Sequence, residues 1–248
     1  GGEVAGAAMR GLRTDTNIDT ISGLVFNAWG DRSFEAPYGV WFDGDWSKPR
    51  LDDPAIQKGL SDYAGLMQAG PSDILSYNWN EAGNAFCNGQ AAFFADASLF
   101  GPWFETDDCP ISKGNTGYMA LPPQTKGGVS YTANWQWGIG MGANAQEKDA
   151  GWYFIQYMTD KYAEPKIGTF HGGAGRISTW ENEEYTSTLN PDYVSATLES
   201  MKTVRTSVVP VKDFNKYALE IMDVILDIHG GSSSEDATAK GNANFKAM

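Results

Sequence analysis

The sequence predicts an α/β fold on three observations. Amphipathic segments with a helical period recur along the 248 residues, and short apolar runs of strand length lie between them. Hydrophobic residues make up 42% of the chain, which is sufficient for a folded core. Helices that alternate with short strands favour an α/β architecture over an all-helical or an all-β one.

The predicted helices each carry an apolar face and typical end residues. In the clearest of them Asp53 and Pro54 stand at the start, where a capping side chain and a proline are favoured, and Gly70-Pro71 stands at the end. The segment Asn215–Ile228 has the best-developed apolar stripe, and Gly230-Gly231 ends it. The other helices are predicted to start near Asn17, to cover residues 80–86, to cover residues 146–161 and to begin at Ser234.

Short apolar runs between turn residues predict the strands. Residues 91–95 form a buried strand that ends at Asp96, and residues 117–123 form a strand that two prolines stop. A third strand covers residues 129–141, and Asp43-Gly44 predicts a hairpin. That hairpin lies within residues 34–49, and a glycine-rich loop covers residues 170–176.

The charge balance narrows the range of partners. Eighteen basic residues against 31 acidic ones give a net charge of −13, which repels nucleic acid and anionic lipid. No apolar run approaches the roughly 18 residues that span a bilayer. The chain opens at Gly1 without an initiator methionine or a leader, so either a leader has been removed or the chain is a fragment. From the negative net charge we expect that the protein binds no nucleic acid and that its ligand is neutral or cationic.

Nine tryptophans give the chain its most distinctive chemistry. In the densest group, residues 131–138, indoles alternate with amides. An indole stacks on the apolar face of a sugar or polyol, while a neighbouring amide bonds the hydroxyl rim. On a strand, Trp135 and Trp137 would share one face, and Asn134 and Gln136 the other. The pattern indicates a carbohydrate or polyol site, and the alternative is that the indoles fill a hydrophobic core.

Catalytic and metal sites find little support in the sequence. With two histidines and two cysteines, a His/Cys zinc cluster is excluded, and we expect no metal and no cofactor. Neighbouring carboxylates such as Asp43 and Asp45 would suit a glycoside hydrolase, but they stand in turns, where Asp is common. We therefore expect a binding protein and no enzyme, and the alternatives are a glycoside hydrolase or a free-standing carbohydrate-binding module.

The state of the two cysteines is left open. Cys87 and Cys109 lie 22 residues apart. In an oxidising compartment a disulfide across such a loop would stabilise the fold by about 3 kcal/mol. The alternative is two unpaired thiols.

Several short motifs occur in an order that resembles one family. Residues 86–92 read aromatic-x-x-Gly-x-Ala-Ala, and Gly101-Pro102-Trp103 follows them. Leu121-Pro122-Pro123 and then Lys148–Ile155 complete the series. In this order and spacing the chain resembles the type 1 extracellular solute-binding proteins of bacterial ABC importers. Within that family it is most similar to the sugar and sugar-alcohol binders related to maltose-binding protein.

The resemblance implies a periplasmic-binding-protein-like fold of type II, with two α/β lobes that enclose a ligand in a cleft and with only part of the fold in this chain. Residues 1–132 and 186–248 would form a near-complete C-terminal-type lobe. Residues 133–185 would be a remnant of the N-terminal-type lobe, with hinge crossings near 131–138 and 180–190. A missing N-terminal segment or a separate chain would complete the fold.

The resemblance also implies a function. The chain would be the substrate-binding component of a bacterial ABC importer, periplasmic or else extracellular and membrane-tethered. It would bind a sugar or sugar alcohol in the cleft by aromatic stacking and hydrogen bonds, and deliver it to the permease subunits.

The resemblance finally indicates which residues meet the ligand. Asp96 and Ser98 stand where the family places polar contacts, and the alternative for both is a turn or helix cap. Arg10 stands where related polyol binders carry an arginine that faces the cleft, and the alternative is a solvated surface arginine. Trp135 would supply the stacking platform. The full set is Arg10, Asp96, Ser98, Asn134, Trp135, Trp137, Gly172, Gly173 and Arg176.

Overall fold

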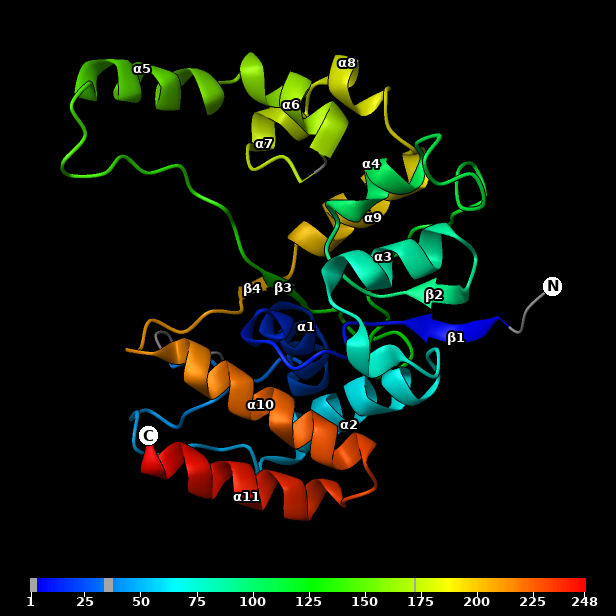
Figure 1. Ribbon diagram of the computed structural model, residues 1–248, viewed down its shortest axis with the longest axis vertical. Coiled ribbons are helices and arrows are strands. Elements are labelled where there is room, and N and C mark those ends of the chain that lie inside the picture. The colour runs from blue at the N-terminus through cyan, green and yellow to red at the C-terminus, as the bar shows by residue number, and fades with distance from the viewer. Residues whose placement is uncertain (1–3, 34–37, 172) are drawn as a thin grey trace. The chain divides into compact units, whose positions relative to one another are not determined.

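The computed structural model describes residues 4–33, 38–171 and 173–248 (Figure 1). The chain divides into two compact units, and each is discontinuous in sequence. The larger unit consists of Gly1–Asp96, Ala120–Trp135 and Glu199–Met248, and the smaller unit of Ala97–Met119 and Gln136–Leu198. These units divide the chain at other residues than the lobes expected from the resemblance, whose ranges 1–132, 186–248 and 133–185 stay a prediction.

Two pairs of short parallel strands form in the larger unit. Strand β1 (Ala5–Ala8) pairs with β2 (Ala91–Phe94), with Ala5 opposite Ala91. Strand β3 (Thr132–Asn134) pairs with β4 (Val204–Thr206), with Thr132 opposite Val204. The strand predicted over 129–141 is therefore reduced to three residues, and the strand predicted over 117–123 is wrong, since that segment has no regular structure.

The helices of the larger unit carry its core. They are α1 (Ile18–Trp29) after the short 3₁₀ turn η1 (Asp15–Asn17), α2 (Pro54–Gln68), α3 (Trp79–Cys87) after the turn η2 (Ile74–Ser76), α10 (Phe214–His229) and α11 (Ser234–Ala247). Figure 1 shows α10 and α11 side by side next to α2, and all three pack on one another. The predicted start of α2 is confirmed, because the Asp53 side chain accepts a hydrogen bond from the backbone N–H of Ala55 at 2.9 Å.

The core of the larger unit is apolar and closely packed. Phe26, Trp41 and Tyr63 are among its fully buried side chains, and each contributes on the order of 2 kcal/mol through burial of its apolar surface. Helices α1 and α2 approach closely at Gly59, where a Cβ atom would lie 2.6 Å from Cα of Val25. Any larger residue at this position would therefore push the two helices apart.

The predicted hairpin is present in its described part. Phe42 forms an antiparallel bridge with Pro49, and the N–H of Asp43 donates to the carbonyl of Lys48 at 2.9 Å. Gly44 has a φ of 64°, which suits a tight turn. Residues 34–37 of the predicted segment lie outside the described residues.

The smaller unit contains short helices around a small aromatic core. They are α4 (Phe100–Phe104), α5 (Lys148–Met158), α6 (Ala163–His171), α7 (Ile177–Trp180), α8 (Glu183–Thr186) and most of α9 (Pro191–Met201). Trp180, Tyr185 and Tyr193 form the core with Ala174. Helix α6 continues through residues 170 and 171, where the sequence predicts a loop, and α5 has no buried residue.

Candidate functional site

Polar residues at the carboxyl ends of β1, β2, β3 and β4 form one cluster in the larger unit. Arg10 follows β1, Asp96 follows β2, Asn134 ends β3 and Ser207 follows β4. Hydrogen bonds and charge interactions link them through Asp19. We call Arg10, Asp19, Asp96, Asn134 and Ser207 the strand-end cluster. Open α/β sheets bind their ligands at this edge.

Arg10 and Asp96 form a buried, bidentate ion pair. Nε of Arg10 donates to Oδ2 of Asp96 and Nη2 donates to Oδ1, both at 2.6 Å, and the side chains are 3% and 1% exposed. Nη1 and Nη2 also donate to the carbonyl of Thr16 and to Oγ1 of Thr20, each at 3.1 Å. The alternative of a solvated surface arginine is therefore wrong for Arg10. Two residues that the resemblance assigns to the ligand fix each other's position.

Asp19 is a member of the cluster that the sequence analysis missed. It lies in the first turn of α1, and its Oδ1 accepts a hydrogen bond from Oγ of Ser207 at 3.1 Å. Ser207 in turn donates its backbone N–H to the carbonyl of Asn134 at 3.2 Å. Burial raises the pKa of Asp19 to about 6, against the opposing effects of the Ser207 hydrogen bond and the Arg10 charge. The sequence contains one indication of Asp19. It is an acidic residue near the predicted start of a helix, three residues after Thr16, and threonine often caps helices.

The two indoles of the predicted aromatic wall belong to different units. Trp135 is half-buried in the larger unit, while Trp137 belongs to the smaller unit and is 87% exposed. Because β3 ends at Asn134, the alternation of a strand does not extend to either indole. The prediction that a strand places Trp135 and Trp137 on one face is therefore wrong. Asn134 itself is exposed at the end of β3.

The remaining predicted contacts belong to the smaller unit. Ser98 and Gly173 are exposed, Gly173 has a φ of 65°, and Gly172 lies outside the described residues. Arg176 is held by its own unit, because its Nε donates to the carbonyl of Thr159 at 2.6 Å. Its side chain borders a shallow, open depression with Tyr153 and Asp160.

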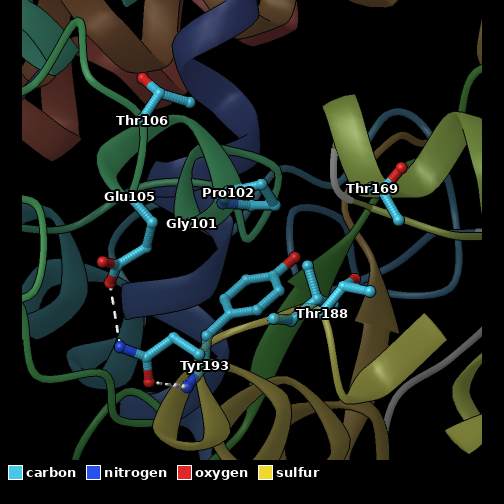
Figure 2. Close-up of a pocket in the computed structure, with 9 residues that line it drawn as sticks. Gly101, Pro102, Glu105, Thr106, Thr169, Thr188 and Tyr193 are labelled. Atoms are coloured by element: carbon cyan, nitrogen blue, oxygen red, sulfur yellow. Dashed lines mark hydrogen bonds between the residues drawn. The ribbon is translucent and has the colours of Figure 1, made fainter. Parts of the chain in front are cut away.

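A polar cavity that the sequence did not predict lies within the smaller unit. It has a volume of about 210 Å³, and Figure 2 shows residues of α4, α6 and α9 around it. Oε1 of Glu105 accepts from Nδ2 of Asn190 at 2.9 Å and from Oη of Tyr118 at 3.0 Å, and Oε2 accepts from the N–H of Gly114 at 2.8 Å. Glu105 thus holds the wall of the cavity together. The lining residues are Gly101, Pro102, Glu105, Thr106, Thr169, Thr188, Leu189, Asn190 and Tyr193.

Within residues 4–33, 38–171 and 173–248, no group of three or more His, Cys, Asp and Glu side chains is placed to hold a metal ion. Both Cys87 and Cys109 are disulfide-bonded. In the described part of the chain, no helix combines the length and the apolar character needed to cross a bilayer.

Comparison of the sequence with known proteins points to one family. The family of bacterial extracellular solute-binding proteins matches residues 16–164. A mannitol-binding protein of Pseudomonas aeruginosa is 28% identical over 207 residues, which are 80% of this chain and 44% of that protein. The chain therefore spans less than half the length of this relative.

Solved structures with the same fold belong to solute-binding proteins. An ABC transporter solute-binding protein of Agrobacterium radiobacter K84 in complex with ribitol has a TM-score of 0.77 at 18% identity, over 98% of this chain and 59% of that one. The maltose-bound MalE3 protein of T. maritima has a TM-score of 0.79 at 19% identity, over 98% of this chain and 60% of that one. These likenesses confirm the predicted periplasmic-binding-protein-like fold, of which this chain spans about 60%.

Proposed function

Because the chain belongs to the family of bacterial extracellular solute-binding proteins, we propose that it is the ligand-binding component of a bacterial ABC importer and that its ligand is a sugar or a sugar alcohol. The family is one of binding proteins and not of enzymes. Proteins similar to this chain are named for mannitol or were solved with ribitol or maltose. The strand-end cluster is the observation that carries the proposal to this chain's own residues.

The chemistry of the strand-end cluster suits a hydroxylated ligand. Each hydroxyl group of a polyol is both a donor and an acceptor. The cluster presents the half-buried carboxylate of Asp19 and the exposed amide of Asn134. Arg10 and Asp96 hold each other in a buried ion pair, so the geometry around the site is fixed before a ligand arrives. Asn134 is exposed at the end of β3 and can contact a ligand without a conformational change.

Aromatic stacking is the second proposed contribution. Trp135 follows directly on β3 and is half-buried, so one part of the indole is supported while another part can contact a ligand. A micromolar affinity requires about −8 kcal/mol. Several hydrogen bonds at about 1 kcal/mol each and one stacked indole can supply that amount. The proposed contacts of the smaller unit are Ser98, Trp137, Gly172, Gly173 and Arg176.

The proposed partners and location follow from the same assignment. Importers of this kind need a permease in the membrane, so we propose that permease subunits receive the ligand from this protein. We also propose a periplasmic location, or an extracellular one with a membrane tether. Because the chain spans 44% of its relative and about 60% of the similar structures, we further propose that another segment or chain completes the fold.

The alternative functions are not favoured by any observation. Asp43 and Asp45, a carboxylate pair considered for glycoside hydrolysis, serve a surface turn, where Oδ1 of Asp45 accepts from the N–H of Ser47 at 2.9 Å. A free-standing carbohydrate-binding module would be built mostly of strands, whereas helices dominate the described residues.

Isothermal titration calorimetry against a panel of sugars and sugar alcohols tests the proposed function. The panel includes D-mannitol, ribitol and maltose, and the protein is expressed together with whatever residues precede Gly1 in its natural form. We expect a micromolar Kd for at least one member and no heat with amino acids as control ligands. A folded protein that binds no member of the panel would overturn the proposal.

A further inference from the structure

Asp19 and Asp96 are the two carboxylates of the strand-end cluster, and they differ in whether a carboxylate oxygen is available to a ligand. Asp96 uses both carboxylate oxygens for Arg10 and is almost fully buried. Asp19 is half-buried, and in the described part of the chain its one hydrogen-bond donor is Oγ of Ser207, which reaches Oδ1. Among the described residues, none donates to Oδ2 of Asp19, which is a strong acceptor.

The position of Asp19 is fixed by packing. Helix α1 packs on β3, where a Cβ atom at Gly23 would lie 3.8 Å from the backbone nitrogen of Ala133. The first turn of α1 consequently lies at the carboxyl end of β3, and the hydrogen bond to Ser207 ties it to the end of β4. The charges of Arg10 and Asp96 act on it from the ends of β1 and β2. Asp19 thus lies where the ends of β1, β2, β3 and β4 meet.

A purely structural role does not explain a carboxylate at this position. A neutral asparagine could accept the same hydrogen bond from Ser207 without the cost of burying a charge. Instead the chain keeps a carboxylate whose pKa burial raises to about 6. Charged groups held in an environment that disfavours their charge are concentrated at functional sites.

We propose that Asp19 is a further ligand-contacting residue of this protein, and that its Oδ2 accepts a hydrogen bond from a hydroxyl group of the bound sugar or sugar alcohol. This inference rests on the proposed function and adds a residue that the family resemblance does not assign. An ionised carboxylate forms stronger hydrogen bonds with hydroxyl groups than an amide or a hydroxyl does. Asp19 therefore contributes to affinity directly, while Arg10 and Asp96 hold the surrounding geometry.

The proposal has a consequence for the pH dependence of binding. The groups that face Asp19 are Arg10, Asp96, Asp15 of η1 and the uncharged Ser207 and Asn134. The neighbouring helices contribute two further hydrogen bonds. The hydroxyl of Tyr63 on α2 donates to the carbonyl of Arg10, and the sulfur of Met222 on α10 accepts from the side-chain amide of Asn17. In the free protein Asp19 loses its charge as the pH falls through about 6. Because the ionised carboxylate accepts the ligand's hydroxyl more strongly than the protonated carboxyl group does, the affinity falls with that charge, by up to about tenfold at pH 5.

Calorimetry with D-mannitol and ribitol as probes, at pH 7.5 and at pH 5.0, tests this inference. The Asp19→Asn variant is expected to bind about tenfold more weakly than the natural protein at pH 7.5, because a charge-assisted hydrogen bond is lost. It is also expected to lose most of the difference between the two pH values. The matched control is Glu235→Gln, an exposed acid in the first turn of α11 of the same unit, which is expected to bind within twofold of the natural protein.

The possible outcomes separate this inference from the proposed function. If the natural protein binds a probe and Asp19→Asn binds it equally, with the same pH profile, Asp19 is not a contact and the proposed function stands. If neither protein binds any member of the panel, both proposals fall. Should Asp19→Asn fail to fold, the pH profile of the natural protein decides, because a flat profile between pH 5.0 and 7.5 contradicts the role of Asp19.

Discussion

The two units of this chain are stabilised in different ways. The larger unit encloses an apolar core formed by α1, α2, α10 and α11, in which side chains such as Ile21 and Ile225 are fully buried. The smaller unit has a core of a few aromatic residues, and α5 exposes Phe154 and three other aromatic side chains. Burial of apolar surface therefore accounts for much more of the stability in the larger unit.

In the smaller unit, carboxylates take over part of the stabilising role. Glu105 accepts three hydrogen bonds at the cavity shown in Figure 2. Glu164 likewise accepts from the N–H groups of Gly175 and Arg176, at 3.0 and 3.2 Å, and from the hydroxyl of Thr179. A unit joined by a few polar contacts opens locally more easily than one with a large core. The larger unit thus offers the firmer support for a binding site.

The largest expected loss of stability comes from breaking the buried ion pair of the strand-end cluster in the larger unit. Replacement Arg10→Ala leaves Asp96 buried without its charge partner, and we expect a loss of about 3–5 kcal/mol in the free energy of unfolding. Urea denaturation measures it. The matched control is Arg13→Ala, which removes a bidentate pair with Asp223 whose side chains are 50% and 31% exposed. That variant should lose less than about 1 kcal/mol, and equal losses would show that burial of the Arg10 pair is unimportant.

Truncation of one apolar side chain in each unit tests the difference between their cores. Ile21→Ala on α1 opens a cavity in the core of the larger unit and should cost about 2–5 kcal/mol. Phe154→Ala on α5 removes a side chain that is 56% exposed and should change stability by less than about 0.5 kcal/mol. Both are measured by thermal and urea denaturation. A large loss for Phe154→Ala would contradict the description of α5 as an uncovered helix.

Removal of a carboxylate that stabilises the smaller unit should lower the stability by a moderate amount. Glu105→Ala removes the acceptor shared by Tyr118, Asn190 and the N–H of Gly114, and we expect a loss of about 1–3 kcal/mol. Hydrogen exchange should quicken in residues 97–119 and stay unchanged in α1 and α2. Glu181→Ala, at an exposed position after α7, is the control with little expected change. Protection that falls equally in both units would argue against separate stabilisation.

The smallest predicted effect concerns the two indoles. Trp135→Ala should weaken binding of the best ligand in the panel by at least tenfold, or about 1.4 kcal/mol, with little loss of stability. Trp137→Ala, in the smaller unit, should weaken it less, because Trp137 is 87% exposed. Calorimetry on both variants measures the difference. An unchanged Kd for Trp135→Ala would remove this residue from the proposed site.

Helices were easier to predict from the sequence than strands. The apolar stripes and end residues of α1, α2 and α10 correspond closely to the observed helices, because these signals are local. Strand β1 has the sequence Ala-Gly-Ala-Ala, which carries no strand pattern, and it forms through its pairing with β2 far along the chain. For residues 117–123 and 135–141 the reverse holds: their composition is typical of strands, but they pair with no strand among the described residues.

The contacts within the candidate site were likewise not predictable from the sequence. The resemblance named Arg10 and Asp96, but it did not show that they bind each other, because 86 residues separate them in sequence. Asp19 was missed because an acid in the first turn of a helix is common and usually needs no further explanation. Its place in the cluster depends on the hydrogen bond from Ser207, and the two residues are far apart in the sequence.

The hydrogen bond from Ser207 to Asp19 joins residues that are 188 positions apart, and this has a consequence for biosynthesis. A growing polypeptide cannot complete the larger unit until Glu199–Met248 has left the ribosome. Until then β3 lacks its neighbour β4, and α1 and α2 lack the cover of α10. Such non-local topologies fold slowly and leave apolar surface open to aggregation in the meantime. The nascent chain therefore has a long interval in which a chaperone that binds apolar segments would find its targets on α1 and α2.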